Sequence, residues 1–245
     1  NPATEDTFAE VSSATADEIG QAAEAGQAAF ESSWRDMPPG ERTRLLRNFA
    51  KRIHENVETL AQLETRNVGK PIGDARWEAD AGAKVFDYYA GAIGHLCGQT
   101  IPVARGGFDF TLRQPMGVIA AITPWNFPFL IACWKVAPAL AAGNSVVLKP
   151  ASLTPLTALM LGQLAQEAGL PDGVLQVVPG SGSEAGNALA THPLVRKIGF
   201  TGSTEVGATI MKLTADDIKR VSLELGGKSP NIVFADADWQ RAAAE

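Results

Sequence analysis

The sequence contains little cysteine. Cys97 and Cys133 are the two cysteines among its 245 residues, and each lies among apolar neighbours. Two isolated thiols provide neither a disulfide framework nor the paired spacing of a zinc site. Because chains without disulfides are typical of reducing compartments, we expect a cytoplasmic protein.

The sequence also lacks a block of basic residues. Its 21 Lys and Arg are outnumbered by 27 Asp and Glu, which gives a formal net charge of −6. Proteins that bind nucleic acid need clustered positive charge to neutralise the phosphates. We therefore expect no nucleic-acid partner.

No apolar run is long enough to cross a membrane. Residues 116–148 are the most apolar stretch, yet Lys135, Asn144 and three prolines interrupt it. A helical span needs about 20 apolar residues in succession. The first six residues, NPATED, lack the basic-then-apolar pattern of a signal peptide. We therefore expect no membrane partner, and we interpret the apolar stretch as a buried strand–helix–strand unit.

Residues 1–99 are predicted to be mostly helical. Thr15 and Glu18, in the segment TADE, fit a capping box, in which the two residues exchange hydrogen bonds at the start of a helix. The spacing of apolar residues predicts helices over residues 16–34, 41–54, 56–67 and 73–94. We expect Trp77 and Phe86 to be core contacts of the last of these helices.

The pattern changes to a period of two over residues 100–115. Phe108, Phe110 and Leu112 alternate with small or polar residues after the turn RGG, which is typical of a β-hairpin. Such a hairpin packs on its own chain or reaches another subunit, and the pattern leaves both arrangements open. We call this segment the arm.

From residue 116 to residue 245, strands and helices alternate. Near-continuous apolar runs predict buried parallel strands over residues 118–122, 145–148, 174–178, 195–200 and 221–225. Helices are predicted between them, over residues 129–141, 155–168, 183–190 and 204–213. This alternation predicts an α/β fold with a doubly wound, Rossmann-like parallel sheet. Residues 232–234 are interpreted as one more strand, and Asp238 as the cap of a final helix.

Polar or glycine-rich turns follow all five strands. They are TPWN at residues 123–126, KPAS at 149–152, PGSG at 179–182, TGS at 201–203 and ELGG at 224–227. Ligands of open parallel sheets bind beyond the carboxyl ends of the strands. Each turn alone has a structural explanation, such as a helix start or a solvated strand end. Together they predict one dinucleotide-sized site at this edge of the sheet.

Glycines mark two of these turns as candidate phosphate sites. Gly202 and Ser203 stand where a strand meets a helix, and backbone N–H groups at a helix N-terminus bind anions such as a pyrophosphate. Gly182 and Gly186 are placed in the same way after the third strand. Glycines at such turns more often serve packing, so the inference depends on all five turns together.

Two side chains indicate how a dinucleotide would be held. Lys149 offers a point charge and three donors, which suit ribose hydroxyls or a phosphate. Ser152 stands where a carboxylate would hold a ribose 2′-hydroxyl and repel a 2′-phosphate. Because serine removes that repulsion, both NAD and NADP stay open as cofactors.

Asn126 and Glu224 are the candidate catalytic residues. The amide of Asn126 is able to donate a hydrogen bond to a developing oxyanion, although an Asx turn or a helix cap explains it equally well. Glu224 follows an apolar strand and precedes two glycines. We expect it to be half-buried there and to serve as a general base.

Four independent motifs resemble the aldehyde dehydrogenase superfamily, in order and at suitable spacing. They are PWNFP at residues 124–128, KPA at 149–151, FTGS at 200–203 and LELGGKSP at 223–230. The resemblance extends over nearly all 245 residues. Residues 98–102 and 134–143 are similar to the branch that acts on betaine aldehyde and amino-aldehydes. Ser152 is similar to what NADP-using succinate-semialdehyde enzymes carry.

The resemblance implies NAD(P)-dependent oxidation of an aldehyde to a carboxylic acid through a cysteine thiohemiacetal and a thioester. Asn126 would hold the oxyanion, and Glu224 would activate the water that hydrolyses the thioester. Lys149 and Ser152 would hold the adenosine ribose, and Ser203 would meet the pyrophosphate. Further family contacts to the cofactor match Thr123, Trp125, Val206 and Leu225.

The resemblance also implies that this chain is a fragment. The nucleophilic cysteine of the family lies beyond the glutamate motif, past Glu245, and neither Cys97 nor Cys133 replaces it. We expect Cys133 to be a core thiol. The chain would then be a cofactor-binding part without the catalytic cysteine domain. The full-length enzyme would act on a small-molecule aldehyde as a homodimer or homotetramer, with the arm between subunits.

Two other interpretations stay open. A non-catalytic nucleotide-binding module would keep this fold without a nucleophile. A related enzyme that passes the acyl group to coenzyme A or phosphate would not need Glu224, because a hydrolytic base is useful only when water is the acceptor.

Overall fold

A five-stranded parallel sheet forms the centre of the computed structural model, which describes residues 1–244. The strands are β3 (Val118–Ile122), β4 (Ser145–Lys149), β5 (Leu175–Val177), β6 (Val195–Thr201) and β7 (Arg220–Glu224). They lie in the order β5–β4–β3–β6–β7, so the direction of winding reverses between β3 and β6. This order is that of a doubly wound sheet, and the predicted fold class is confirmed.

Helices cover both faces of the sheet and form a separate hydrophobic core on each face. One layer contains α2 (Pro39–Glu55), α3 (Val57–Val68), α4 (Ile72–Ala92), α5 (Pro128–Ala141) and α6 (Leu156–Glu167). The other contains α1 (Ala16–Ala29), α7 (Asn187–Thr191) and α8 (Thr204–Thr214). The other helical elements are three short turns, η1 (Phe30–Trp34), η2 (Ile93–His95) and η3 (Gly182–Gly186), and a last helix beyond the sheet, α9 (Trp239–Ala244).

The central strand β3 is buried on both faces. Ile119 and Ala121 belong to the core of the α2–α6 layer, whereas Val118, Ala120 and Ile122 belong to the core on the α1 side. Successive strand residues point to opposite faces, so both faces need apolar side chains. The near-continuous apolar run of the sequence has this origin.

The N-terminal helices pack directly on the sheet layer. Gly82 of α4 lets α5 approach closely, because a Cβ at this position would lie 2.5 Å from the Phe129 ring and 3.0 Å from the sulfur of Cys133. Phe86 is fully buried, as predicted, but Trp77 is 61% exposed. The inward positions of α4 follow a spacing of three or four residues, and Trp77 falls between them. The prediction that Trp77 is a core residue was therefore wrong.

The predicted caps of the first and last helices form. Thr15 and Glu18 make the expected capping box of α1. Asp238 Oδ1 accepts a hydrogen bond from the backbone N–H of Arg241 at 3.2 Å, at the start of α9 (Trp239–Ala244). Each bond satisfies a backbone donor at the start of the helix that the helix itself leaves without a partner.

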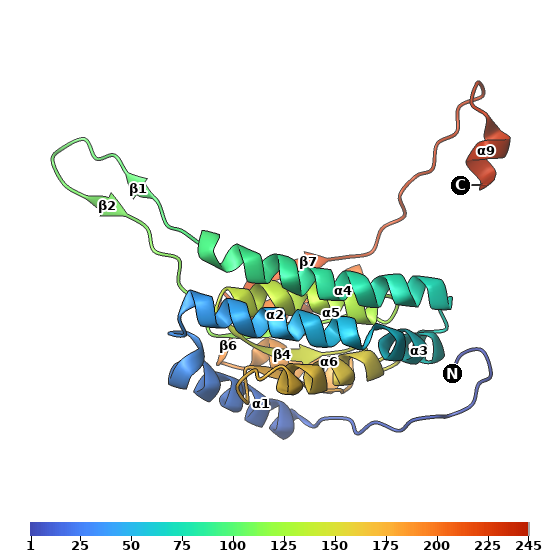
Figure 1. The fold of residues 1–245 in the computed structure, drawn as a ribbon, viewed down its shortest axis with the longest axis horizontal. Coiled ribbons are helices and arrows are strands. Elements are labelled where there is room, and N and C mark those ends of the chain that lie inside the picture. Colours follow the sequence, from blue (N-terminus) through green and yellow to red (C-terminus); the bar gives the residue numbers. More distant parts are fainter. Residues whose placement is uncertain (245) are drawn as a thin grey trace.

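The arm is a short antiparallel ribbon that projects from the body (Figure 1). Its strands β1 (Thr100–Ile101) and β2 (Asp109–Phe110) pair over two residues each. The rings of Phe108 and Phe110 contact each other with their centroids 5.3 Å apart, and both side chains are exposed. The predicted hairpin is confirmed, with apolar side chains on its surface.

The chain leaves the body after β7 (Figure 1). Residues 232–234, interpreted from the sequence as a strand, form none, and all three side chains are exposed. A strand needs a neighbouring strand to satisfy its backbone, and this segment runs away from the edge of the sheet.

No helix within residues 1–244 has the length and apolar character of a membrane span.

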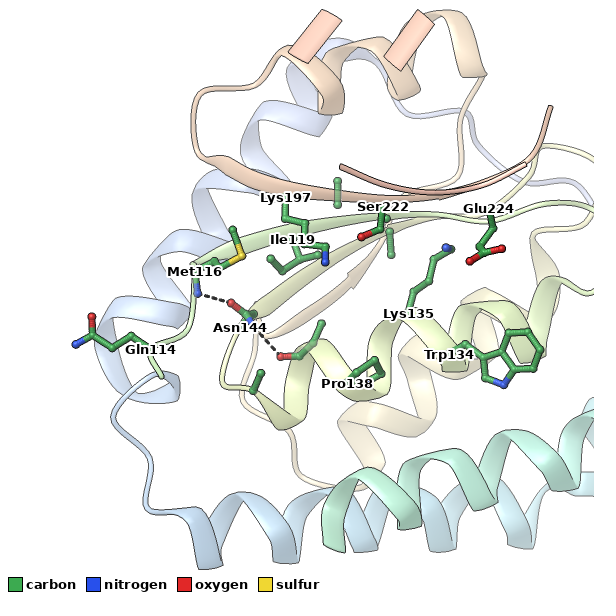
Figure 2. Close-up of a pocket in the computed structure, with 15 residues that line it drawn as sticks. Gln114, Met116, Ile119, Trp134, Lys135, Pro138, Asn144, Lys197, Ser222 and Glu224 are labelled. Carbon is green, nitrogen blue, oxygen red and sulfur yellow. Dashed lines mark hydrogen bonds between the residues drawn. The ribbon is translucent and has the colours of Figure 1, made fainter. Parts of the chain in front are cut away.

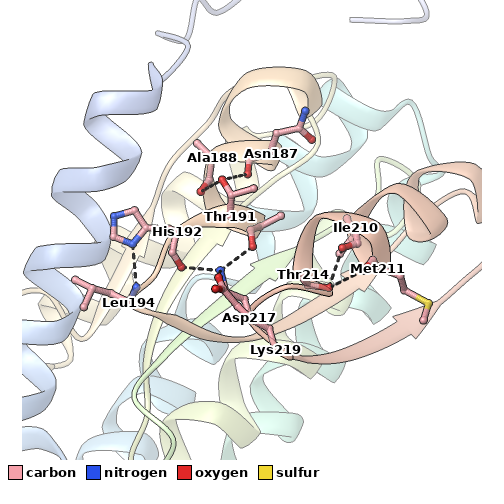
Figure 3. A network of polar contacts seen from close by, with 11 residues as sticks. Asn187, Ala188, Thr191, His192, Leu194, Ile210, Met211, Thr214, Asp217 and Lys219 are labelled. Atoms are coloured by element: carbon pink, nitrogen blue, oxygen red, sulfur yellow. Dashed lines mark hydrogen bonds and ion pairs between the residues drawn. The ribbon is translucent and has the colours of Figure 1, made fainter.

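A polar network holds the amino end of β7 against α7 (Figure 3). The side chain of Lys219 is 4% exposed, and its Nζ donates to the carbonyl oxygens of Ala190 at 2.9 Å and His192 at 2.8 Å. The same ammonium pairs with Asp217 at 3.1 Å. The network fixes β7 at the end of the sheet opposite to the predicted site.

Candidate functional site

A groove of about 890 Å³ lies along the carboxyl ends of β3, β6 and β7. The predicted site residues that line it are Thr123, Trp125, Asn126, Gly202, Ser203, Val206, Glu224 and Leu225. These residues come from three separate turns of the sequence. Their meeting follows from the parallel sheet, which places the carboxyl ends of all its strands at one edge.

The N-terminus of α8 forms one wall of the groove. Ser203 Oγ accepts a hydrogen bond from the backbone N–H of Val206 at 3.2 Å and so caps the helix. Gly207 allows Leu225 to pack closely on α8, since a Cβ there would lie 2.6 Å from a methyl carbon of Leu225. The first turn of a helix carries partly positive N–H groups, which favour an anion in this part of the groove.

Lys149 and Ser152 do not line the groove, although Ala151 between them in the sequence does, and the two side chains share one acceptor. Lys149 is 4% exposed, and its Nζ donates to the carbonyl oxygens of Pro150 and Gly180, both at 2.8 Å. Ser152 Oγ donates to the same Gly180 oxygen at 3.0 Å. Burial lowers the pKa of Lys149 to about 8. An ammonium has three N–H groups, so one remains for a ligand after these two bonds.

Gly186 and Gly182 differ in their surroundings. Gly186 is buried against the Lys149 side chain, because a Cβ there would lie 3.7 Å from Lys149 Cε. Gly182 opens η3 and faces free space, while Ser181 Oγ caps that turn by accepting from Glu184 N–H at 3.1 Å. Gly186 is therefore in ordinary contact with Lys149, where a Cβ would also fit, whereas Gly182 presents bare backbone to solvent.

Asn126 is exposed at the start of the turn that leads into α5. Its Oδ1 accepts a hydrogen bond from the backbone N–H of Phe127 at 3.1 Å. On the other side of the turn, Thr154 Oγ1 donates to the carbonyl of Trp125 at 3.1 Å. An Asx turn or a helix cap would bond an N–H two or three residues further on, so neither of the local structures expected for Asn126 forms, and α5 begins without a side-chain cap. Because the Asn126 oxygen accepts only the adjacent N–H, its Nδ2 stays available as a donor.

Glu224 is exposed, and the expectation of a half-buried carboxylate was wrong. The carboxylate lies at the end of β7, which is the edge strand of the sheet. An edge strand has a neighbour on one side only, and an apolar run does not reveal that position.

Lys135 is a groove residue that the sequence reasoning did not select. It lies on α5 and lines both the groove and a second cavity of about 480 Å³ between α5 and the sheet, as does Glu224. Figure 2 shows its ammonium directed toward Glu224. Burial lowers the pKa of Lys135 to about 8, and Glu224 opposes this shift. The available signal was a lone charge within the apolar helix of residues 128–141.

Neither cysteine lines the groove. Cys133 is fully buried in α5, and burial raises the pKa of its thiol, with a further contribution from Glu78 and Glu64. The expected core thiol is confirmed, since a neutral thiol is a poor nucleophile. Cys97 is exposed just before the arm. In the part of the chain that the structure describes, no group of three or more His, Cys, Asp and Glu side chains is arranged to hold a metal ion.

Known proteins match the whole chain. The profile of the aldehyde dehydrogenase family matches residues 1–245. Phenylacetaldehyde dehydrogenase of Pseudomonas fluorescens is 50% identical, with 99% of this chain and 50% of that protein covered. A solved NAD+ complex of aldehyde dehydrogenase from Bacillus cereus is 46% identical, with a TM-score of 0.96, and the match covers 100% of this chain and 50% of that one.

A second solved structure, an NADP-dependent enzyme of E. coli, is 45% identical, with a TM-score of 0.96. The match covers 100% of this chain and 51% of that one. In each comparison the chain thus spans about half the length of the relatives that it matches.

Proposed function

The chain belongs to the aldehyde dehydrogenase family, and we propose that it is the cofactor-binding part of an enzyme that oxidises an aldehyde to a carboxylic acid with NAD or NADP. The observation that carries the proposal is the groove at the carboxyl edge of the sheet. It brings a helix N-terminus, an amide and a carboxylate together, and Ala151, which is two residues after the buried Lys149, also lines it.

The residues present fit a dinucleotide. Lys149 has one N–H group left for a ribose hydroxyl, and Ser152 lies next to it on the same carbonyl. The start of α8 suits the pyrophosphate. Thr123 Oγ1 lines the groove, is buried and has no hydrogen-bond partner among residues 1–244, so it is a further polar atom for the ligand.

In the proposed reaction a thiolate adds to the aldehyde, and a dinucleotide held by these residues would supply the acceptor for the hydride that the adduct loses as it becomes a thioester. Asn126 Nδ2 donates a hydrogen bond to the oxyanion that forms when a thiolate attacks the carbonyl. Glu224 then takes a proton from the water that hydrolyses the thioester. Its exposed position suits this role, because a general base for hydrolysis must reach water.

The first test is a calorimetric titration of the chain with NAD and with NADP. We expect saturable binding of at least one of them. The Ser152→Glu variant is expected to lose at least about tenfold of its NADP affinity and to keep NAD, because like charges brought together cost several kcal/mol. Absence of binding in a chain that melts cooperatively would remove the cofactor assignment.

Glu224 is tested in the full-length enzyme. Replacement by glutamine is expected to slow deacylation more than acylation, measured by single-turnover kinetics against the steady state. An unchanged deacylation rate would remove Glu224 from the hydrolytic step and would favour coenzyme A or phosphate as the acceptor of the acyl group.

A nucleotide-binding module without turnover is the second candidate. The observation in its favour is that neither Cys97 nor Cys133 reaches the groove. Reduction of NAD or NADP that depends on added aldehyde, measured with the full-length protein, separates the two candidates. Betaine aldehyde, amino-aldehydes and succinate semialdehyde are the substrates to test first.

The full-length enzyme is proposed to be a cytoplasmic homodimer or homotetramer. The exposed rings of Phe108 and Phe110 on the arm support contact with another subunit. The two free cysteines support a reducing compartment. Deletion of residues 100–112 is expected to produce a smaller species in analytical ultracentrifugation.

A further inference from the structure

A cluster of buried charges lies behind the turn that carries Asn126. Glu64 of α3 is 2% exposed and Glu78 of α4 is 1% exposed. Lys70, between the two helices, pairs with Glu78 and lies 3.6 Å from Glu64 Oε1. Thr157 of α6 donates to Glu64 Oε2 at 2.8 Å. Because buried charges are costly unless they are paired, this cluster requires an explanation.

The local sequence fixes Lys70 in place. Gly69 ends α3 with φ of 85°, a left-handed conformation that glycine adopts without strain. Pro71 is the residue before α4 and begins the next helix. The lysine is therefore held between a helix end and a helix start, with its side chain directed inward.

The cluster contacts the start of α5 at two points. Glu78 Oε1 accepts a hydrogen bond from the backbone N–H of Leu130 at 3.0 Å, in the first turn of α5. This helix has no side-chain cap of its own, so α4 supplies the carboxylate that its N-terminus needs. Lys70 Nζ lies 4.2 Å from the centroid of the Phe127 ring, which is a cation–π contact.

Phe127 connects the cluster to Asn126. Its ring contacts Lys70, and its backbone N–H donates to Asn126 Oδ1 at 3.1 Å. We propose that Lys70 and Glu78 are positioning residues for the Asn126 carboxamide: they fix Phe127 and the first turn of α5, and Phe127 in turn fixes the amide so that Nδ2 is presented to the groove. The meaning of this position for catalysis rests on the proposed function.

Glu64 makes the positioning sensitive to pH. The groups that face it are Glu78 from α4, Lys70 from the turn, the Thr157 hydroxyl from α6 and the Cys133 thiol from α5. Burial and the neighbouring Glu78 raise the pKa of Glu64 to about 7. The pKa of Cys133 is raised far above its usual value, so that thiol stays neutral. When Glu64 loses its proton, its carboxylate competes with that of Glu78 for the Lys70 ammonium. The position of this ammonium over the Phe127 ring then changes.

The test follows the side-chain amide resonance of Asn126 in the ¹⁵N-labelled chain. It is assigned by its loss in Asn126→Ser. Lys70→Met keeps an unbranched side chain over Phe127 and removes the charge. We expect the Asn126 resonance to shift and broaden in this variant. The matched control is Glu58→Gln, which breaks another ion pair between α3 and α4, that of Glu58 with Arg76 at 2.8 Å.

An unchanged resonance in Lys70→Met, or an equal change in the control, would contradict the proposal. If Lys70→Met does not fold, Glu78→Gln takes its place, because glutamine keeps an acceptor for Leu130 N–H and removes the charge that holds Lys70. The resonance is expected to shift there too, by less than in Lys70→Met. No shift in Glu78→Gln would overturn the positioning role.

A pH titration separates positioning from general stabilisation. In the wild-type chain the Asn126 resonance is expected to titrate with a midpoint near pH 7, and the titration is expected to be absent in Glu64→Gln. A midpoint that survives Glu64→Gln, or no titration in the wild-type chain, would overturn the pH dependence. Failure of the proposed function would appear elsewhere, as unchanged acylation in full-length Asn126→Ala with the resonances still behaving as described.

Discussion

The two ends of the candidate site are built in opposite ways. At the lysine end, Lys149 and Ser152 are bonded to the same carbonyl oxygen, and Lys149 is almost completely buried. At the glutamate end, Glu224, Asn126 and the neighbouring Trp125 are exposed. A preorganised site loses less entropy when it binds a ligand, so the lysine end is the better candidate for tight binding. The glutamate end instead presents its groups to solvent, which suits chemistry with water.

The buried Lys149 at the lysine end carries a cost in free energy. Burial disfavours the charged form of Lys149, and the two carbonyl oxygens offset part of that cost by accepting hydrogen bonds from the ammonium. A buried lysine with one N–H group left without an acceptor lowers the stability of the fold, so stability alone does not explain its presence. Such perturbed groups cluster at functional sites.

The largest effect on cofactor affinity is expected from replacing the lysine of the lysine end. Lys149→Met is expected to weaken NAD binding by roughly tenfold to a hundredfold, since a hydrogen bond to a charged group contributes about 1.5–3 kcal/mol. The control is Lys135→Met at the glutamate end, where burial lowers the lysine pKa to the same value of about 8. Calorimetry measures both. Equal losses of affinity in the two variants would contradict the inference that the lysine end contributes more to cofactor binding than the glutamate end.

The second prediction concerns Glu64, in the buried charge cluster behind Asn126. Its folded-state pKa is raised from 4.5 to about 7, so its contribution to stability is present below pH 4.5 and is lost as the pH rises through 7. In Glu64→Gln this loss is expected to be absent. The difference in unfolding free energy between variant and wild type should therefore grow with pH over this interval, by on the order of 2 kcal/mol.

Urea unfolding at several pH values measures this difference, and Glu58→Gln serves as the exposed control. A constant offset between Glu64→Gln and the wild type would show that Glu64 keeps an ordinary pKa. The offset itself is not informative, because the substitution also replaces one carboxylate oxygen by an NH2 group beside the Thr157 hydroxyl.

The protonation of Lys149 predicts how cofactor binding depends on pH. Deprotonation leaves two N–H groups, and Pro150 and Gly180 already use two. NAD affinity is therefore expected to fall by up to about tenfold as the pH rises above 8, which is about 1.4 kcal/mol. Titrations on both sides of pH 8 measure the effect. Lys149→Met should show no such fall, and a fall of equal size there would assign it to another group.

Part of this site could be predicted from the sequence alone. The turns that hold Asn126, Ser203 and Glu224 were predictable, because parallel strands end at one edge and strand runs are visible as apolar runs. The exposure of Glu224 was not predictable, since the order of strands in the sheet decides which strand is the edge. The same limit applies to residues 232–234, where an apolar run has no neighbouring strand.

The charged cluster behind Asn126 was also outside the reach of sequence patterns. Glu64, Lys70 and Glu78 look like ordinary surface charges of helices and turns, and a burial of 1% or 2% for the two glutamates follows only from the packing of α3, α4, α5 and α6. Lys135 is an intermediate case. Its lone charge in an apolar helix was visible in the sequence, but its approach to Glu224 depends on how α5 lies on the sheet.

The smallest expected effect separates helix caps from ligand contacts. Ser203→Ala at the glutamate end removes the cap of α8 and is expected to cost about 1 kcal/mol of stability, measured by urea unfolding. Ser181→Ala removes the corresponding cap of η3 at the lysine end. If Ser203 also meets the pyrophosphate, Ser203→Ala weakens NAD binding in addition to stability, whereas Ser181→Ala changes stability alone. Equal effects of the two variants on binding would reduce Ser203 to a cap, and the glutamate end would then contact the cofactor through backbone groups of α8.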